Sequence, residues 1–134
     1  MREKTIEKWL REGCDRLGLL AMKFTSPGND GVPDRLVICP DGRALFVELK
    51  TDTGRLSPIQ AWQHKRMRKV GAKVITVYGT VGVSELLEDL GMVYSDTPRF
   101  QRWREEYGID RSAFQFKDVY GKQDGRDRYA IPTA

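Results

Sequence analysis

The possible folds of this chain are limited above all by a segment near its middle, in which two strand-like runs flank a short turn. Residues 34–39 and 44–50 are rich in apolar side chains, and the residues between them, Pro40-Asp41-Gly42-Arg43, are typical of a turn. Two strands with so short a connection form an antiparallel hairpin. Because side chains alternate along a strand, Glu48 and Lys50 are expected on the same face of the second strand.

Hydrophobic periodicity predicts the other elements of the first 91 residues. Ile6, Leu10 and Cys14 recur at helical spacing, which indicates an amphipathic helix with one buried stripe. Ser57 and Pro58 are typical of the start of a later helix, and glycine follows its end. The order of elements is α-β-β-β-α-β-α, which predicts an α/β fold with a mixed sheet flanked by helices. The expected helices are 3–17, 58–71 and 84–90, and the expected strands are 19–24, 34–39, 44–50 and 73–78.

Composition and cysteine usage limit the class of protein. The 134 residues match one ordinary domain, and no apolar run approaches the roughly 20 residues of a membrane span. The densely charged first 12 residues lack the apolar region of a signal peptide, so a cytoplasmic location in a bacterial or phage-infected cell is expected. Cys14 and Cys39 form no metal-binding pair, and we expect both in the core.

The last 43 residues differ from the rest because they hold eight of the thirteen aromatic residues. We divide the chain into a core of residues 1–91 and an extension of residues 92–134. Phe100, Trp103 and Tyr107 predict a helix that begins near Thr97 and stops at Gly108. The extension could pack on the core, form a dimer arm or contact DNA, and we favour packing or dimerisation.

The positive charge of the chain is concentrated in one region. Residues 53–84 contain no Asp or Glu and carry +6, so the remainder of the +4 chain carries −2. Such a region is typical of a surface that binds phosphates, although a solvated helix face would look the same. Ile59, Trp62 and Val70 are expected to supply the buried side of the helix. The candidate nucleic-acid-binding residues are Arg55, Lys65, Arg66, Arg68, Lys69 and Lys73.

Asp34 and Glu48 are the strongest candidates for metal ligands. They lie 14 residues apart across the predicted hairpin, which can bring their carboxylates together. Mg²⁺ prefers oxygen ligands and needs only one or two carboxylates, and the Leu49 carbonyl could add another oxygen. Lys50 projects from the same face as Glu48, where its ammonium could orient a water or neutralise developing charge. Taken alone, Glu48 and Lys50 are a weak signal, because such pairs are common on the surface of amphipathic strands.

Two further residues are candidates for supporting roles in this site. Glu7 flanks the buried stripe of the first helix, from which it could hold a second metal ion or orient a metal-bound water. Gln60 is the third residue after Ser57, so it could complete a capping box or face the metal site, and the two roles are compatible.

In this order the motifs resemble those of the VRR-NUC (virus-type replication-repair nuclease) family, in the PD-(D/E)XK superfamily. The resemblance covers residues 3 to about 90, about two thirds of the chain. The matching motifs are Glu7, Gly31-Val32-Pro33-Asp34, Val47-Glu48-Leu49-Lys50 and Gly54-Arg55-Leu56-Ser57-Pro58-Ile59-Gln60.

The resemblance implies the restriction-endonuclease-like α-β-β-β-α-β core and a Mg²⁺- or Mn²⁺-dependent endodeoxyribonuclease. Asp34 and Glu48 would bind the metal, Lys50 would be the catalytic lysine, and Glu7 and Gln60 would be further active-site residues. Stand-alone members resemble Holliday junction resolvases, which implies a homodimer acting on branched DNA, as in DNA repair. The alternatives are a non-catalytic nucleic-acid-binding module, a nuclease that acts on linear ends or flaps, and a purely structural protein.

Overall fold

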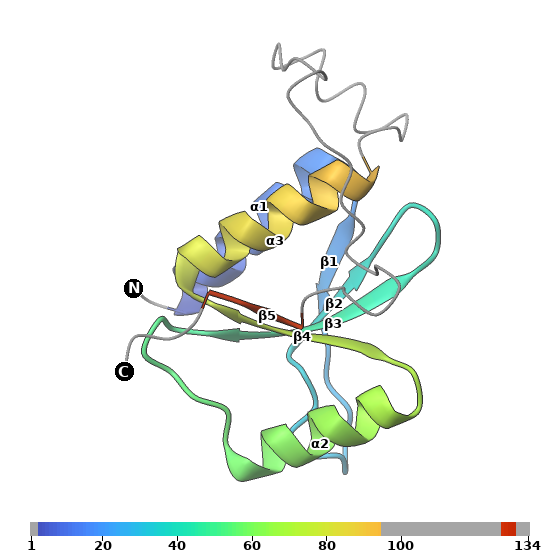
Figure 1. Ribbon diagram of the computed structural model, residues 1–134, viewed down its shortest axis with the longest axis vertical. Helices are drawn as coiled ribbons and strands as arrows, with labels where there is room; N and C mark the ends of the chain where they lie inside the picture. Colours follow the sequence, from blue (N-terminus) through green and yellow to red (C-terminus); the bar gives the residue numbers. More distant parts are fainter. Residues whose placement is uncertain (1–2, 95–126, 131–134) are drawn as a thin grey trace.

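A mixed sheet with helices on both faces forms the centre of the protein (Figure 1). The computed structural model describes residues 3–94 and 127–130. Within them, α1 (Glu3–Leu17) and α3 (Gly79–Tyr94) pack together on one face, and α2 (Pro58–Lys69) covers part of the other. The predicted α/β fold is confirmed. The sheet has the order β1 (Leu20–Lys23), β2 (Arg35–Ile38), β3 (Ala44–Lys50), β4 (Lys73–Tyr78) and β5 (Arg128–Tyr129).

The first three strands form an antiparallel meander, which contains the predicted hairpin of β2 and β3. In the hairpin of β2 and β3, Arg35 lies opposite Val47 and Ile38 lies opposite Ala44. The turn is closed by the Cys39 amide, which donates to the carbonyl of Arg43 at 2.8 Å. Strand β4 then pairs with β3 in parallel, which requires the crossover that α2 provides.

The hydrophobic core lies between the sheet and the pair α1 and α3. The predicted stripe of α1 is buried, and it faces the side chains of β3 that alternate away from Glu48. Cys14 and Cys39 are both buried, so the expectation that they are core residues is confirmed. The β3 side chains in this core are Leu45, Val47 and Leu49, and they are joined by Val37, Ile75 and Val77 of the neighbouring strands.

The third helix is longer than predicted. It runs from Gly79 to Tyr94, so it passes through Gly91, where we expected it to end, and crosses the predicted boundary between core and extension. Gly82 lies inside this helix. A Cβ there would lie 2.7 Å from the carbonyl oxygen of Tyr129, so this position needs a residue without a side chain. Gly82 therefore allows the close approach of β5, and Gly91 does not mark the end of the helix.

Residues of the predicted extension complete the sheet. Strand β5 pairs in parallel with β4, with Tyr129 beside Val77. The Tyr129 hydroxyl donates to Asp89 Oδ2 on α3 at 3.0 Å, and the Ala130 amide donates to Glu85 Oε2 at 3.1 Å. The predicted helix near residues 97–108 lies outside the described residues.

The expected buried side of α2 is wrong. Ile59 is 47% exposed, Trp62 is 53% exposed and Val70 is 86% exposed, whereas Gln63 and His64 are buried. The polar side of α2 therefore faces the sheet. Glu48 and Lys50 lie on the face of the sheet that α2 covers. Among the helices of residues 3–94, none has the length and apolar character needed to cross a membrane.

Candidate functional site

The hairpin brings Asp34 and Glu48 side by side. Arg35 pairs with Val47, so continuing the antiparallel register by one residue places Asp34 next to Glu48. Asp34 Oδ1 accepts a hydrogen bond from the Leu49 amide at 3.2 Å, which fixes this carboxylate against β3. Glu48 itself is only 4% exposed. The two predicted ligands therefore lie at one place, although they are 14 positions apart in sequence.

The pKa of Asp34 reflects this crowding. Burial and then the nearby charge of Glu48 raise the pKa of Asp34 from 3.8 to about 6. Asp34 is half-buried beside the buried Glu48, and a bound cation would relieve the repulsion between two such neighbouring carboxylates. Below about pH 6, a proton would compete with the cation for Asp34.

Gln60 completes the capping box of α2, and its side chain also contacts Glu48. Ser57 Oγ accepts from the Gln60 amide at 3.2 Å, and Gln60 Oε1 accepts from the Ser57 amide at 2.9 Å, which completes the capping box of α2. The other end of the same side-chain amide, Nε2, lies 3.5 Å from Glu48 Oε1. The first turn of α2 thus lies next to Glu48 of the acidic pair.

The loop before Asp34 is docked on α2. Gln63 Nε2 donates to the Asp30 carbonyl at 3.1 Å. Gly31 has φ +86°, and a Cβ there would lie 2.6 Å from the carbonyl oxygen of Ile59. Only glycine meets both conditions without strain, so Gly31 allows the loop to lie directly on the first turn of the helix. This contact fixes Asp34 relative to Gln60.

Lys50 lies on β3 two residues after Glu48 and is half-buried on the same face of the sheet. The loop that follows folds back over it, because the Gly54 amide donates to the Thr51 carbonyl at 3.0 Å. A Cβ at Gly54 would lie 3.3 Å from the Cβ of Lys50. The base of the Lys50 side chain is therefore confined close to Glu48.

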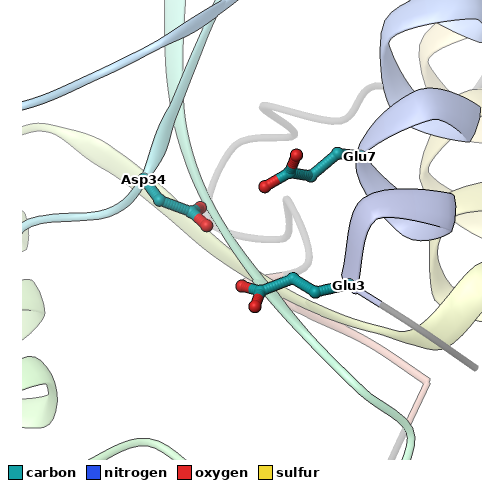
Figure 2. Close-up of side chains that lie close together, drawn as sticks. All are labelled: Glu3, Glu7 and Asp34. Atoms are coloured by element: carbon teal, nitrogen blue, oxygen red, sulfur yellow. The ribbon is translucent and has the colours of Figure 1, made fainter.

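The first helix brings two further carboxylates close to Asp34 (Figure 2). Carboxylate oxygens of Glu3, Glu7 and Asp34 lie within 4.8 Å of one another, and Figure 2 shows the three side chains pointing toward a common point. Glu7 also forms an ion pair with Arg35, with 2.6 Å between Oε1 and Nη2. Sequence reasoning missed Glu3, although its spacing of four residues from Glu7 places both on one face of a helix.

The donor atoms of this site fit a hard divalent cation. Asp34 and Glu48 offer carboxylate oxygens, and the Leu49 carbonyl belongs to the adjoining peptide. Oxygen ligands of this kind suit Mg²⁺ or Mn²⁺ better than softer metals. The chemistry of the residues is thus consistent with the predicted metal.

The predicted basic residues are not equivalent. Arg55, Lys65, Arg66 and Lys69 are exposed, and Arg66 stacks on the ring of Trp62 with 5.2 Å between its Cζ and the ring centroid. Arg68 is instead tied to the sheet, because its Nη2 donates to the Val74 carbonyl at 2.9 Å. Lys73 begins β4 and is half-buried.

Comparisons with known proteins place the chain in a family. No family model matches the sequence. A protein of Acyrthosiphon pisum secondary endosymbiont phage 1 named "Putative nuclease p44" is 43% identical over 77 residues, which are 58% of this chain and 83% of that protein. A solved structure named "VRR_NUC domain" is 38% identical, with a TM-score of 0.61, over 64% of this chain and 94% of its own.

A second solved structure, named "VRR_NUC domain protein", has a TM-score of 0.53 over 68% of this chain and 88% of its own. At 14% identity this likeness supports the fold alone. The two relatives with higher identity are each covered over most of their length, and one of them bears the family name. The chain therefore belongs to the VRR-NUC family.

Proposed function

We propose that this protein is a metal-dependent endonuclease that hydrolyses DNA phosphodiester bonds. The observation that carries the proposal is the pairing of Asp34 with Glu48 on the hairpin, with Lys50 on the same face as Glu48. The likeness of the chain to a solved VRR_NUC domain and to a relative named as a nuclease supports the proposal. The phage source of that relative supports action in the cytoplasm of a bacterial or phage-infected cell.

Each residue of the site has a defined part in the proposed reaction. Asp34, Glu48 and the Leu49 carbonyl would hold Mg²⁺ or Mn²⁺. When bound, the cation would lower the pKa of a coordinated water and stabilise negative charge on the phosphate. Lys50 would orient the attacking water or neutralise the developing charge.

The supporting residues act on the ligands or on a second cation. Gln60 Nε2 faces Glu48 Oε1 and would hold that carboxylate in place. Glu7 would orient water or hold a second cation, with its own position set by Arg35. Glu3 joins Glu7 at this point of the site.

We further propose that the substrate is branched DNA, such as a four-way junction, and that the enzyme is a homodimer. Paired incisions across a junction need two active sites in one assembly, and a chain with one site supplies two by forming a two-fold dimer. The exposed basic residues Arg55, Lys65, Arg66 and Lys69 would contact phosphates, which positions DNA without reading its sequence.

A cleavage assay on a labelled four-way junction and a matched linear duplex tests this proposal. Lys50→Ala should abolish the cutting in Mg²⁺ or Mn²⁺, whereas Lys8→Ala should retain it because Lys8 lies on the exposed side of α1. Paired nicks on the junction, and a particle of about twice 15.4 kDa, are expected.

Three results would contradict parts of this proposal. Equal cutting of the linear duplex would remove the junction preference, and cutting confined to ends or flaps would replace it. A monomer would remove the proposed assembly. Absence of metal-dependent cleavage of any DNA or RNA, with DNA binding retained, would leave a non-catalytic binding module.

A further inference from the structure

His64 is a fully buried polar residue for which the proposed reaction has no role. It lies on α2, four residues after Gln60, so the two side chains leave the same face of the helix. Its exposure is 0%, and within residues 3–94 and 127–130 neither ring nitrogen has a hydrogen-bond partner. Buried polar atoms are rarely left unpaired, so the position of this ring needs an explanation.

The nearest ionisable atom to the ring belongs to a proposed metal ligand. His64 Nε2 lies 3.7 Å from Glu48 Oε1, and Gln60 Nε2 lies 3.5 Å from that same oxygen. Two side chains from adjacent turns of α2 therefore converge on one carboxylate oxygen. At 3.7 Å the His64 contact is slightly too long for a hydrogen bond, and a small shift of the Glu48 side chain would complete it.

We propose that His64 is a positioning residue that donates from Nε2 to Glu48 Oε1 and holds this carboxylate in the orientation that binds a divalent cation. A bare Nε2 lone pair facing a carboxylate oxygen would be repulsive, so the proposed contact requires the tautomer with a proton at Nε2. His64 has this role only if Glu48 binds a cation, so the proposal rests on the proposed function.

The same contact explains why α2 buries its polar side. Gln60 and His64 reach Glu48, while Gln63 reaches the Asp30 carbonyl in the loop before Asp34. The helix thus contacts both ligand-bearing segments through polar groups. Side chains that contact metal ligands in this way fix the ligand geometry, and their loss commonly weakens metal affinity by about 10- to 100-fold.

The tautomer of His64 can be observed directly, because it is the only histidine of the 134 residues. A long-range proton–nitrogen correlation spectrum of the nitrogen-labelled protein will show one imidazole. We expect a proton on Nε2, and a change in the Nε2 resonance in Glu48→Ala. A ring without a proton at Nε2 would overturn the proposal, whatever the metal affinity.

Metal affinity separates positioning from packing. Mn²⁺ binding is measured by calorimetry without DNA, in the wild type, His64→Met and His64→Gln. Methionine fills the space without a donor, so its dissociation constant should rise about 10-fold or more. Glutamine can place its Nε2 near that of histidine and should recover most of the affinity. The control Asp89→Asn alters a buried polar contact on the opposite face of the sheet and should leave Mn²⁺ affinity unchanged.

The outcomes distinguish this proposal from the proposed function. Wild-type affinity in His64→Met, or equal weakening in the methionine and glutamine variants, overturns the positioning role and leaves the nuclease proposal intact. Absence of Mn²⁺ binding by the wild type overturns both. Nitrogen coupling of the imidazole to bound Mn²⁺ in a spin-echo spectrum would make His64 a ligand, which also overturns the positioning role.

Discussion

Replacing Gly31 tests whether docking of its loop on α2 sets the geometry of the site. An alanine at φ +86° adopts the left-handed conformation, which costs about 1–2 kcal/mol. Its Cβ would also lie 2.6 Å from the carbonyl oxygen and 2.9 Å from the carbonyl carbon of Ile59. These atoms belong to backbone at the start of a capped helix, so the loop must move, and overpacking of this kind costs about 1–3 kcal/mol.

The matched control is Gly28→Ala in the same loop. Gly28 has a similar φ of +81°, but a Cβ there would meet nothing within 4 Å. The two variants share the backbone cost and differ in the contact with α2. We therefore expect a loss in the free energy of unfolding of about 2–5 kcal/mol for Gly31→Ala and about 1–2 kcal/mol for Gly28→Ala.

The functional difference should follow the structural one. Movement of the loop displaces Asp34 from Glu48 and Gln60, so Gly31→Ala should bind Mn²⁺ weakly and cut DNA slowly, and Gly28→Ala should resemble the wild type. Urea unfolding gives the stabilities, and calorimetry gives the Mn²⁺ affinities. Equal behaviour of the two variants in both measurements would refute the idea that this contact positions Asp34.

Three other predictions concern charge, burial and the exposed helix face. Folding raises the pKa of Asp34 from 3.8 to about 6, by burial and then by the charge of Glu48, so the stability of the metal-free protein should fall as pH rises through this range. Asp34→Asn should remove most of this pH dependence in urea unfolding with a chelator present, and an unchanged dependence would show that Asp34 is not its source. Tyr129→Phe removes the hydrogen bond to Asp89 Oδ2 and should cost about 1.5–3 kcal/mol in thermal or urea unfolding, and a cost near zero would show that β5 is held by other contacts. Charge reversal of Lys65, Arg66 and Lys69 should weaken DNA binding and flatten its salt dependence with no change in Mn²⁺ affinity, and an unaltered salt dependence would place the DNA elsewhere.

The hairpin and its acidic pair could be predicted because local signals determine them. The turn at residues 40–43 fixes the register, and alternation along β3 assigns Glu48 and Lys50 to one face. The antiparallel pairing then places Asp34 beside Glu48 without further information. These features depend on short-range backbone geometry, which a single sequence expresses well.

The buried side of α2 could not be predicted in the same way. We expected apolar residues to face the sheet, yet Ile59 and Trp62 are exposed while Gln63 and His64 are buried. The helix covers the acidic site, so its inner side is chosen by polar contacts to Glu48 and to the loop before Asp34. Hydrophobic periodicity carries no information on such contacts.

The other omissions have different causes. Strand β5 has two residues, and its pairing with β4 joins positions about 50 apart in sequence, so no local pattern marks it. The length of α3 was underestimated because the helix was expected to begin at Ser84 and Gly91 was interpreted as its stop. Gly82 is instead required where the Tyr129 carbonyl approaches the helix.

The most direct test of a metal-dependent active site at Asp34 and Glu48 is Mn²⁺-dependent cleavage of a four-way junction by wild type, Glu48→Gln and Glu88→Gln. Glu48 is buried beside Asp34 on the face of the sheet that α2 covers, whereas Glu88 is exposed on α3, which packs on the other face. Both substitutions remove one negative charge. We predict that Glu48→Gln leaves the junction uncut while Glu88→Gln cuts it at the wild-type rate. Cleavage by Glu48→Gln at the wild-type rate would contradict the assignment of the active site.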